Sequence, residues 1–476
     1  MKLTIIQQND THGALQSHPE FFWRTGQPEY RETGGLARIA AYVKEAREES
    51  EHLLYVDGGD VFHGSGPLLL TRGSVMVELL NRLGLDAMVP GNWDFAYGAG
   101  RLAELAKGLQ FPVLAANVAP SPDYLSPYVI KEFSGLRVAL VGLTYPHTAA
   151  TMPPSFSEGL SFSLGTEELA GLLPKLRIEE KADIIVLISH MGFPLDAKLA
   201  SLVPGIDIVL SGHSHDRIER PVQVGETWIV QAGSSASFLG RLDLSIESRK
   251  ITDLSYKLIP LYAEAHPPDP EMDELISFLR RPFEASLQEE VGSIKTPLHR
   301  MTLTEAPMDR LITDSYLHAT GADVTFSHGW RYGVPVLPGT LTTGDLYNII
   351  PTNPKLFQME LEGRDILRAL ENNLEQIFSA DAFEQKGGYV LRSSNLSMAF
   401  KPYNPAGARI QFLEIGGSPI DLKKRYTVAG GGEQVLKKFQ EDRHVLGVDA
   451  HTAIRNYLAE HPSGLELDST KQIHTI

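Results

Sequence analysis

The stretch DIVLSGHSHD, residues 207–216, joins a short apolar run to two histidines that stand one residue apart. Apolar runs bounded by small residues are typical of buried strands. Two imidazoles at the end of a strand have two interpretations. They can form a polar turn, or they can bind a metal, because neutral imidazole is the commonest nitrogen ligand for divalent transition metals. One such pair does not decide between the two.

Seven further apolar runs follow the same pattern. They are LTIIQQ (3–8), LLYVDGG (53–59), DAMVPG (86–91), FPVLAAN (111–117), RVALVGLT (137–144), DIIVLISH (183–190) and TWIVQAG (227–233). Between the first two, residues 34–51 carry apolar side chains at helical spacing with charged residues on the other face. Alternating strands and helices predict a layered α/β domain that extends to about residue 245.

The second half of the chain differs in composition. Residues 272–290, MDELISFLRRPFEASLQEE, predict a linker helix that Pro282 kinks or interrupts. After about residue 296, glycine- and proline-rich turns separate short strands, which favours an α+β domain. We therefore expect an α/β domain over residues 1–265, a linker helix over 266–295 and a substrate-binding domain over 296–476.

Length and composition limit the kinds of partner. The 476 residues carry a formal net charge of −16, which disfavours nucleic acid polymers and anionic membrane surfaces. The chain has no cysteine, so a metal would need oxygen and nitrogen ligands. No secretory signal or long apolar segment is evident, which favours a cytoplasmic location. Composition does not indicate the oligomeric state.

Polar residues follow five of the predicted strands, where a metal site could form. In α/β sheets, loops at the carboxyl ends of strands converge on ligands. The mixture of carboxylates, an amide and imidazoles suits Mn, Zn, Co, Ni or Fe better than calcium. Seven ligands are too many for one tetrahedral ion and match two ions that share a carboxylate, as in dinuclear hydrolases. The candidates are Asp10, His12, Asp60, Asn92, His190, His213 and His215.

The succession DTHG, GGD, GNWDF, SHMG and GHSH resembles the 5′-nucleotidase family of calcineurin-like metallophosphoesterases, specifically a bacterial cytosolic branch with tryptophan at the usual catalytic histidine. The resemblance implies a four-layer α/β/β/α domain, a 5′-nucleotidase-type C-terminal domain and two divalent metal ions. It assigns Asp10, His12 and His215 to one ion and Asn92, His190 and His213 to the other, with Asp60 as the bridge.

The same resemblance implies hydrolysis of nucleotides or related small phosphoesters by a metal-bridging hydroxide. Asp60 and Asn92 would be the catalytic residues, with Asn92 helping to hold the phosphoryl oxygens. We thus expect a small-molecule phosphoester as the substrate.

The sequence departs from the family at its asparagine motif. Trp93 stands where the family has a catalytic histidine, and Ala96 stands where it has that histidine's aspartate partner. His63 could substitute, although a histidine with a purely structural role in a loop is the commoner case. A tryptophan here also resembles thiosulfate-hydrolysing enzymes of the superfamily. Two alternatives therefore stay open: hydrolysis of a sulfur ester, and binding of metal or nucleotide without turnover.

The C-terminal domain carries two further family motifs. SHGWRYG places Arg331 at the substrate-binding arginine, and VAGGGEQ places Glu433 at an acid that follows a glycine-rich loop. A lone arginine is more often a surface charge, so only the motif supports its role. The family sandwiches the nucleobase between two aromatic residues, but Thr352 and Thr427 stand at the aligned positions. This difference argues against tight recognition of a nucleoside.

Overall fold

A computed structural model describes residues 1–432, 435–439, 443–468 and 470–476. The chain divides into two compact units, Met1–Phe283 and Glu284–Ile476. Their boundary falls inside the range predicted for the linker. Helix α8 (Pro270–Arg280) ends where a 3-10 turn containing Pro282 begins, and α9 (Glu284–Leu287) follows in the second unit.

The first unit contains two large sheets, which hold all eight of the predicted strands. In spatial order, one sheet consists of β17 (Lys250–Pro260), β16 (Phe238–Glu247), β1 (Lys2–Gln8), β4 (Leu53–Asp57), β5 (Ala87–Met88), β6 (Val113–Leu114) and β8 (Leu125–Ser126). The other consists of β14 (Val222–Val224), β15 (Thr227–Gln231), β13 (Ile208–Ser211), β12 (Ile184–Ser189), β10 (Leu136–Leu143) and β9 (Tyr128–Phe133).

The two sheets pack face to face. One buried cluster joins Ile5 and Val56 of the first sheet to Val138, Val186 and Leu210 of the second. The central strands of each sheet run parallel to one another, which explains their nearly continuous apolar sequences.

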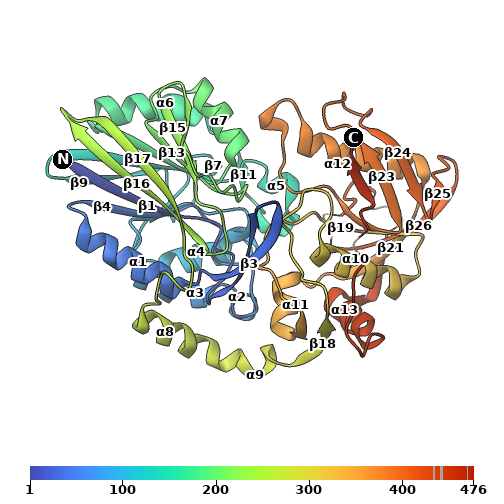
Figure 1. Ribbon diagram of the computed structural model, residues 1–476. Helices are drawn as coiled ribbons and strands as arrows, with labels where there is room; N and C mark the ends of the chain where they lie inside the picture. Colours follow the sequence, from blue (N-terminus) through green and yellow to red (C-terminus); the bar gives the residue numbers. More distant parts are fainter. Residues whose placement is uncertain (433–434, 440–442, 469) are drawn as a thin grey trace. The chain divides into compact units, whose positions relative to one another are not determined.

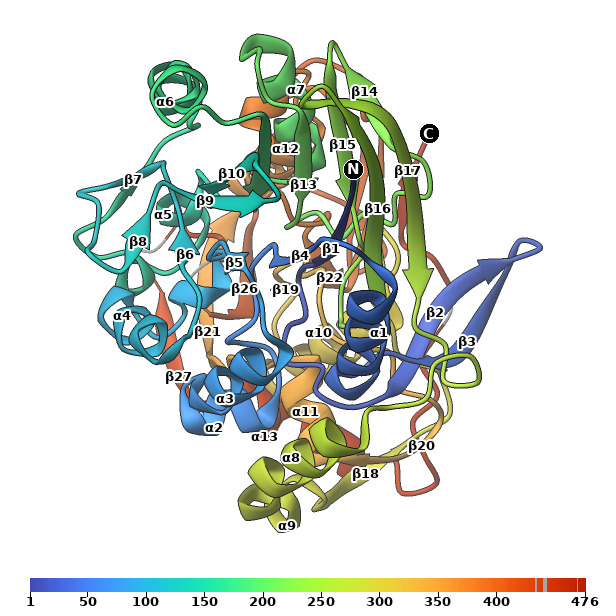
Figure 2. The same ribbon diagram turned by 90° about the vertical axis from the view of Figure 1, so that its left-hand side faces the viewer.

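Helices cover the outer faces of this pair of sheets. Helices α1 and α3 lie on the side of β1 and β4, whereas α6 and α7 lie on the side of β12 and β13 (Figures 1 and 2). The predicted four-layer α/β/β/α fold is therefore confirmed. The helices of this unit before α8 are α1 (Leu36–Glu49), α2 (Gly66–Thr71), α3 (Ser74–Leu83), α4 (Ala99–Gly108), α5 (Thr148–Thr151), α6 (Thr166–Ile178) and α7 (Phe193–Leu202).

Some strands of this unit were not predicted from the sequence. The hairpin of β2 (His18–Arg24) and β3 (Gln27–Thr33) follows the first strand, and β7 (Val118–Ala119) pairs with β11 (Ser161–Phe162). The long antiparallel partners β16 and β17 extend the first sheet beyond β1.

The second unit is α+β, as expected. Its five-stranded sheet has the order β22 (Arg392–Ser394), β19 (Val324–Ser327), β26 (Arg425–Gly431), β21 (Lys355–Glu362) and β27 (His444–Asp449). The smaller sheets contain β25 (Ser418–Pro419), β24 (Ile410–Ile415), β23 (Leu396–Phe400) and β28 (Ile473–Thr475), and β18 (Glu290–Ile294) with β20 (Gly339–Thr342). The helices after α9 are α10 (Pro307–Thr320), α11 (Thr343–Ile349), α12 (Gly363–Phe378) and α13 (Ala450–Ala459).

Strand β21 separates the two cores of this unit. Leu356 packs in the cluster that includes α10 and α13, whereas Phe357 and Met359 pack in the cluster that includes α12. Among the described residues, no helix is both long enough and apolar enough to cross a bilayer.

Candidate metal centre

The structure places all seven predicted ligands just after the carboxyl ends of strands. Strands β1, β4 and β5 of the first sheet precede Asp10 and His12, Asp60, and Asn92, respectively. Strands β12 and β13 of the second sheet precede His190, and His213 with His215. Loops from both sheets therefore contribute to one site.

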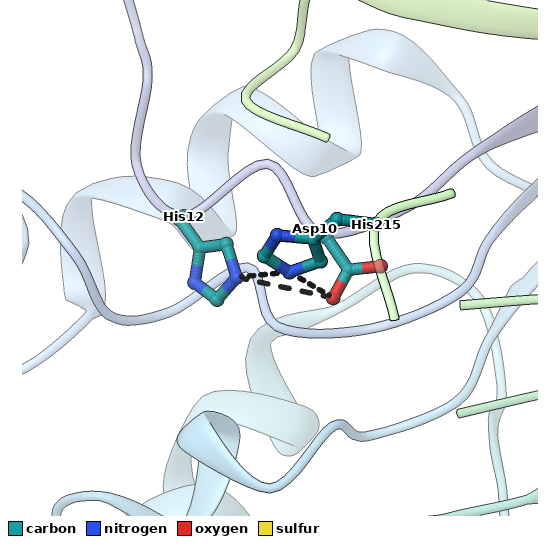
Figure 3. Close-up of side chains that lie close together, drawn as sticks. All are labelled: Asp10, His12 and His215. Atoms are coloured by element: carbon teal, nitrogen blue, oxygen red, sulfur yellow. Dashed lines mark hydrogen bonds and ion pairs between the residues drawn. The ribbon is translucent and has the colours of Figure 1, made fainter. Parts of the chain in front are cut away.

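Six of the seven residues form two groups. Asp10, His12 and His215 offer ligand atoms that lie within 4.8 Å of one another, and Asp60, His190 and His213 do the same. In the first group His215 Nε2 lies 3.1 Å from both His12 Nε2 and Asp10 Oδ1 (Figure 3).

The two groups adjoin through the carboxylate of Asp60. Its Oδ2 atom lies 3.2 Å from His190 Nε2 in its own group and 3.7 Å from His12 Nε2 in the other. The carboxylate of Asp60 therefore lies near both groups, and the bridging role that the family resemblance implies for it stays a prediction.

Hydrogen bonds hold the carboxylate of Asp10 with one oxygen turned toward the site. Oδ2 accepts hydrogen bonds of 2.8 Å from Asn9 Nδ2 and from the backbone N–H of His213. The other oxygen, Oδ1, is the atom that faces His215. Outer partners of this kind fix the orientation of metal ligands.

The ring of His190 is oriented in a similar way. Its Nδ1 donates to the carbonyl of Gly58 at 2.5 Å, so the lone pair of the neutral ring lies on Nε2. That nitrogen faces Asp60 Oδ2. A proton or a cation must lie between or beside two such atoms at 3.2 Å, and a divalent metal bound by the neutral ring meets this requirement.

Asn92 provides a second observation that fits a metal. Its side-chain oxygen is buried and has no hydrogen-bond partner among the described residues. Burying an acceptor without a partner costs free energy, so such an atom indicates a ligand. Asn92 also lies between Gly91 and Trp93, both of which contact Asp60.

Five of the seven candidate ligands have a backbone conformation that is unusual for residues other than glycine. Asp10, His12, Asp60, His213 and His215 have φ angles of 52°, 46°, 59°, 67° and 62°. Residues other than glycine rarely adopt this left-handed region, and strained backbone is often found at functional sites. The sharp turns let side chains one residue apart enter the same small volume.

Burial and charge shift the ionisation of these groups in opposite directions. Burial lowers the pKa of His190, but Asp60 and Asp10 outweigh burial and raise that pKa to about 10. Burial and the nearby His215 lower the pKa of His12 to about 4, against the effect of Asp60. At this site the ionisation of the imidazoles therefore depends strongly on the charges of the carboxylates.

Aromatic rings pack around the ligands. Tyr145 stacks on His213 with ring centroids 4.0 Å apart, and Trp93 stacks on His63 at 4.6 Å. Phe156 contacts Trp93 edge to face. The tryptophan in the place of the missing histidine is therefore part of an aromatic cluster, and its indole has no acidic proton for a leaving group.

Sequence reasoning missed the role of Asp94, which lies inside the GNWDF motif. Its buried carboxylate accepts hydrogen bonds from the backbone N–H groups of Gly91, Asp60, Val61 and Phe62. Burial and the charge of Asp60 raise the pKa of Asp94 to about 6, against these N–H groups. A signal existed in the sequence, namely an acid two residues after a predicted ligand, but the sequence does not show its four partners.

The predicted substrate residues belong to the second unit. Arg331 is half-buried and follows β19. Burial and the charge of Arg331 lower the pKa of His328 to about 4. The adjacent carbonyl of Tyr332 accepts a 2.7 Å hydrogen bond from the buried guanidinium of Arg300. Glu433 lies outside the described residues.

Thr427 and Thr352 are the residues aligned with the family's two aromatic positions. Thr427 lies near the start of β26, and its N–H donates to Asp323 Oδ2 at 2.8 Å, at the end of the strand opposite the glycine-rich loop. An added Cβ at Gly431 would lie 3.1 Å from Pro354, so the segment after Thr352 does lie beside that loop. The correspondence of Thr352 and Thr427 to the family's aromatic positions stays a prediction.

Comparisons with known proteins agree with this architecture. Residues 3–217 match the calcineurin-like phosphoesterase family, and residues 290–431 match the 5′-nucleotidase C-terminal domain. Together these matches span both units.

Three known proteins illustrate the similarity. The trifunctional nucleotide phosphoesterase YfkN of Bacillus subtilis is 26% identical over 93% of this chain, which spans 32% of that relative's length. The solved sulfate thiohydrolase SoxB of Thermus thermophilus is 28% identical, with a TM-score of 0.91 over 100% of this chain and 96% of its own. A 5′-nucleotidase precursor from Thermus thermophilus is 27% identical, with a TM-score of 0.88 over 100% and 99%.

The fold, the two groups of ligands and these matches define a dinuclear metallohydrolase. The chain belongs to the 5′-nucleotidase family of calcineurin-like phosphoesterases. It is a metal-dependent phosphoester hydrolase that uses two divalent metal ions.

Proposed function

We propose that this enzyme hydrolyses nucleotides or related small phosphoesters, with the seven strand-end residues as its metal ligands. The observation that carries the ligand assignment is the position of Asp60, whose Oδ2 lies between His190 and His12. The names of YfkN and of the 5′-nucleotidase precursor support the nucleotide substrate.

The chain's own residues would hold and orient the reacting group. The two ions, when bound, supply Lewis-acid charge to the phosphoryl oxygens and lower the pKa of an attacking water. Asn92 would bind one ion through Oδ1. Its Nδ2 lies 3.5 Å from Met152 Sδ, a weak acceptor, and so can donate to a phosphoryl oxygen instead.

Among the described residues, neither Trp93 nor His63 is suited to protonate the departing oxygen. Trp93 cannot transfer a proton, and His63 has its pKa lowered to about 3 by burial and by His12. General acid help typically contributes about 10²–10⁴-fold. We therefore propose that good leaving groups are strongly preferred, and that a nitrophenyl phosphate reacts much faster than an alkyl phosphate.

Arg331 would bind an anionic part of the substrate through its planar fork of donors. Arg300 helps to hold this segment in place, because it donates a hydrogen bond to the carbonyl of Tyr332, the residue after Arg331. We keep Glu433 as a predicted substrate contact on the basis of its motif alone.

A test of the proposed function starts from protein stripped of metal and reconstituted separately with Mn, Zn, Co and Ni. Phosphate release from nucleotides, phosphomonoesters and phosphodiesters is then measured. Metal-dependent release supports the proposal. If two ions bind per chain and no substrate releases phosphate, the proposed substrate class is rejected.

Hydrolysis of a sulfur ester is a second candidate. It is favoured by the close structural match to SoxB together with Trp93 at the place of the usual histidine. The same preparations would be offered thiosulfonate and sulfate esters, and sulfate would be measured. Sulfate release without phosphate release would support this candidate. Ligand binding without either product would contradict both candidates.

A cytoplasmic location stays a prediction. Fractionation of cells that express the protein from its natural gene would test it.

A further inference from the structure

We propose that Asp94 is a positioning residue that pre-forms the metal centre by fastening the Asp60 and Asn92 loops to each other, whether or not metal is bound. This inference rests on the proposed ligand assignment. Asp94 belongs to neither group of candidate ligands, and both of its carboxylate oxygens accept hydrogen bonds from backbone N–H groups of the loops.

The carboxylate of Asp94 is fully used by four backbone N–H groups. Oδ2 accepts from Gly91 at 2.7 Å and from Asp60 at 2.8 Å. Oδ1 accepts from Val61 at 2.8 Å and from Phe62 at 2.9 Å. Asp94 is 1% exposed, so these charge-assisted bonds are shielded from water.

The link between the two loops is reciprocal. Asp94 holds the backbone of Asp60, and Asp60 Oδ1 in turn accepts a 2.8 Å hydrogen bond from the backbone N–H of Trp93. The oxygen that remains, Oδ2, is the one that faces His190 and His12. The pair therefore determines which oxygen of Asp60 is offered to the metals.

A further hydrogen bond connects the Asp60 loop to the loop that carries His12. The carbonyl of Asp60 accepts a 3.0 Å hydrogen bond from the N–H of His12. Asp60 has a strained φ of 59°, a conformation that persists only when its surroundings hold it. The four backbone N–H hydrogen bonds that the buried carboxylate of Asp94 accepts provide such a restraint. We therefore expect the site to keep its geometry without metal.

The first experiment uses the wild-type protein and needs no variant. Amide hydrogen exchange is measured by mass spectrometry on peptides that cover residues 58–63 and 90–96, before and after metal is removed with a chelator. The proposal predicts that protection of these amides changes by less than about threefold, because Asp94 rather than metal holds them. Loss of their protection in the metal-free protein would overturn it.

The second experiment measures metal affinity. In Asp94→Asn, one oxygen that accepts two N–H groups is replaced by an amide that donates. The affinity for Mn or Zn, measured by competition with a chelating dye, should fall about 10- to 100-fold, as for other partners of metal ligands. Circular dichroism verifies that the variant is folded. A folded Asp94→Asn with wild-type affinity for both ions would overturn the proposal.

Asp207→Asn is the matched control. Asp207 also accepts a backbone N–H, that of Ile185 at 2.6 Å, but it precedes β13, at the end of the strand opposite His213 and His215. Its variant should bind metal as the wild type does. If Asp94→Asn does not fold, the exchange experiment decides. If the wild type binds no divalent ion, the proposed function fails. Hydrogen exchange of the metal-free protein then still tests whether the amides of residues 58–63 and 90–96 are protected.

Discussion

The backbone N–H of Trp93 donates a 2.8 Å hydrogen bond to Asp60 Oδ1. The residue that replaces the family's catalytic histidine thus still serves the metal centre, through its backbone and independently of its side chain. The side chain at this position bears on what can reach the leaving group, whereas the hydrogen bond to the proposed bridging carboxylate comes from the backbone. Because the backbone and the side chain of Trp93 act separately, the chain can keep all seven candidate ligands and yet lack the family's histidine and its aspartate partner.

Replacing the bridge should disable the site. Asp60→Asn removes the charge between His190 and His12, so we expect fewer than two ions per chain and a loss of at least about a hundredfold in kcat/KM. Metal content is measured by mass spectrometry of the dialysed protein. Asp123→Asn, at an exposed position, is the control and should retain both ions. Full activity in a folded Asp60→Asn would contradict the bridging role.

Gly91→Ala should perturb the site by contact alone. An added Cβ would lie 2.1 Å from Asp60 Oδ1 and 2.6 Å from Asp60 N, so the carboxylate must move. We expect weaker metal binding and an activity loss of roughly tenfold or more, by analogy with other displaced metal-ligand partners.

The control for this change is Gly100→Ala in α4, where an added Cβ meets nothing within 4 Å. There the change should leave metal binding intact and stabilise the fold by up to about 1 kcal/mol, because alanine favours helix. Calorimetry of both variants checks the contrast. Equal effects of the two substitutions would show that the contact at Gly91 is unimportant.

The stability of the metal-free protein should depend on pH through Asp196. Burial raises the pKa of this residue to about 7, against hydrogen bonds from Ser189 and Ser211. Because the folded-state pKa lies above the usual 3.8, the contribution of Asp196 is fully present below pH 4 and is lost as pH rises toward and through 7.

Asp196→Asn stays neutral at every pH and removes this dependence. Relative to wild type, the variant should therefore gain up to roughly 4 kcal/mol in free energy of unfolding between pH 4 and pH 8. Urea denaturation at several pH values measures the difference. A constant difference across this range would mean that Asp196 ionises normally.

Arg331 should act on substrate binding more than on turnover. Arg331→Ala is expected to raise KM about tenfold or more with little change in kcat, and Arg331→Lys should recover only part of the loss because lysine lacks the planar fork. Arg364→Ala is the control, since this arginine is exposed on α12 and pairs with Glu362. A fall in kcat alone would contradict the assignment.

The sequence predicted the candidate metal ligands better than it predicted the residues that orient them. The seven candidate ligands follow five strands, so a local signal, an apolar run and the polar residues after it, was enough to find His190 or Asp60. The partners that orient them are not local. Asp94 accepts hydrogen bonds from three residues more than 30 positions away, Asp60, Val61 and Phe62. Tyr145 stacks on His213 from the loop after β10. Neither relation has a local signature.

The fold, too, was predictable from the sequence only in part. The parallel central strands were predictable because their apolar runs are continuous, whereas the hairpin of β2 and β3 is half exposed and its sequence, HPEFFWRTGQPEYRET, alternates poorly. A motif gives the order of residues along the chain, but the direction of a strand decides which end faces a site.

The position of β1 in its sheet bears on the order of folding. This first strand lies between β4 and β16, and Leu3 pairs with Leu244 across most of the unit. The sheet therefore cannot close until about 250 residues have left the ribosome, and such distant pairing is slow. Asp10 and His12 are synthesised first but must wait for His215, so a nascent chain acquires its metals only near the end of this unit's synthesis.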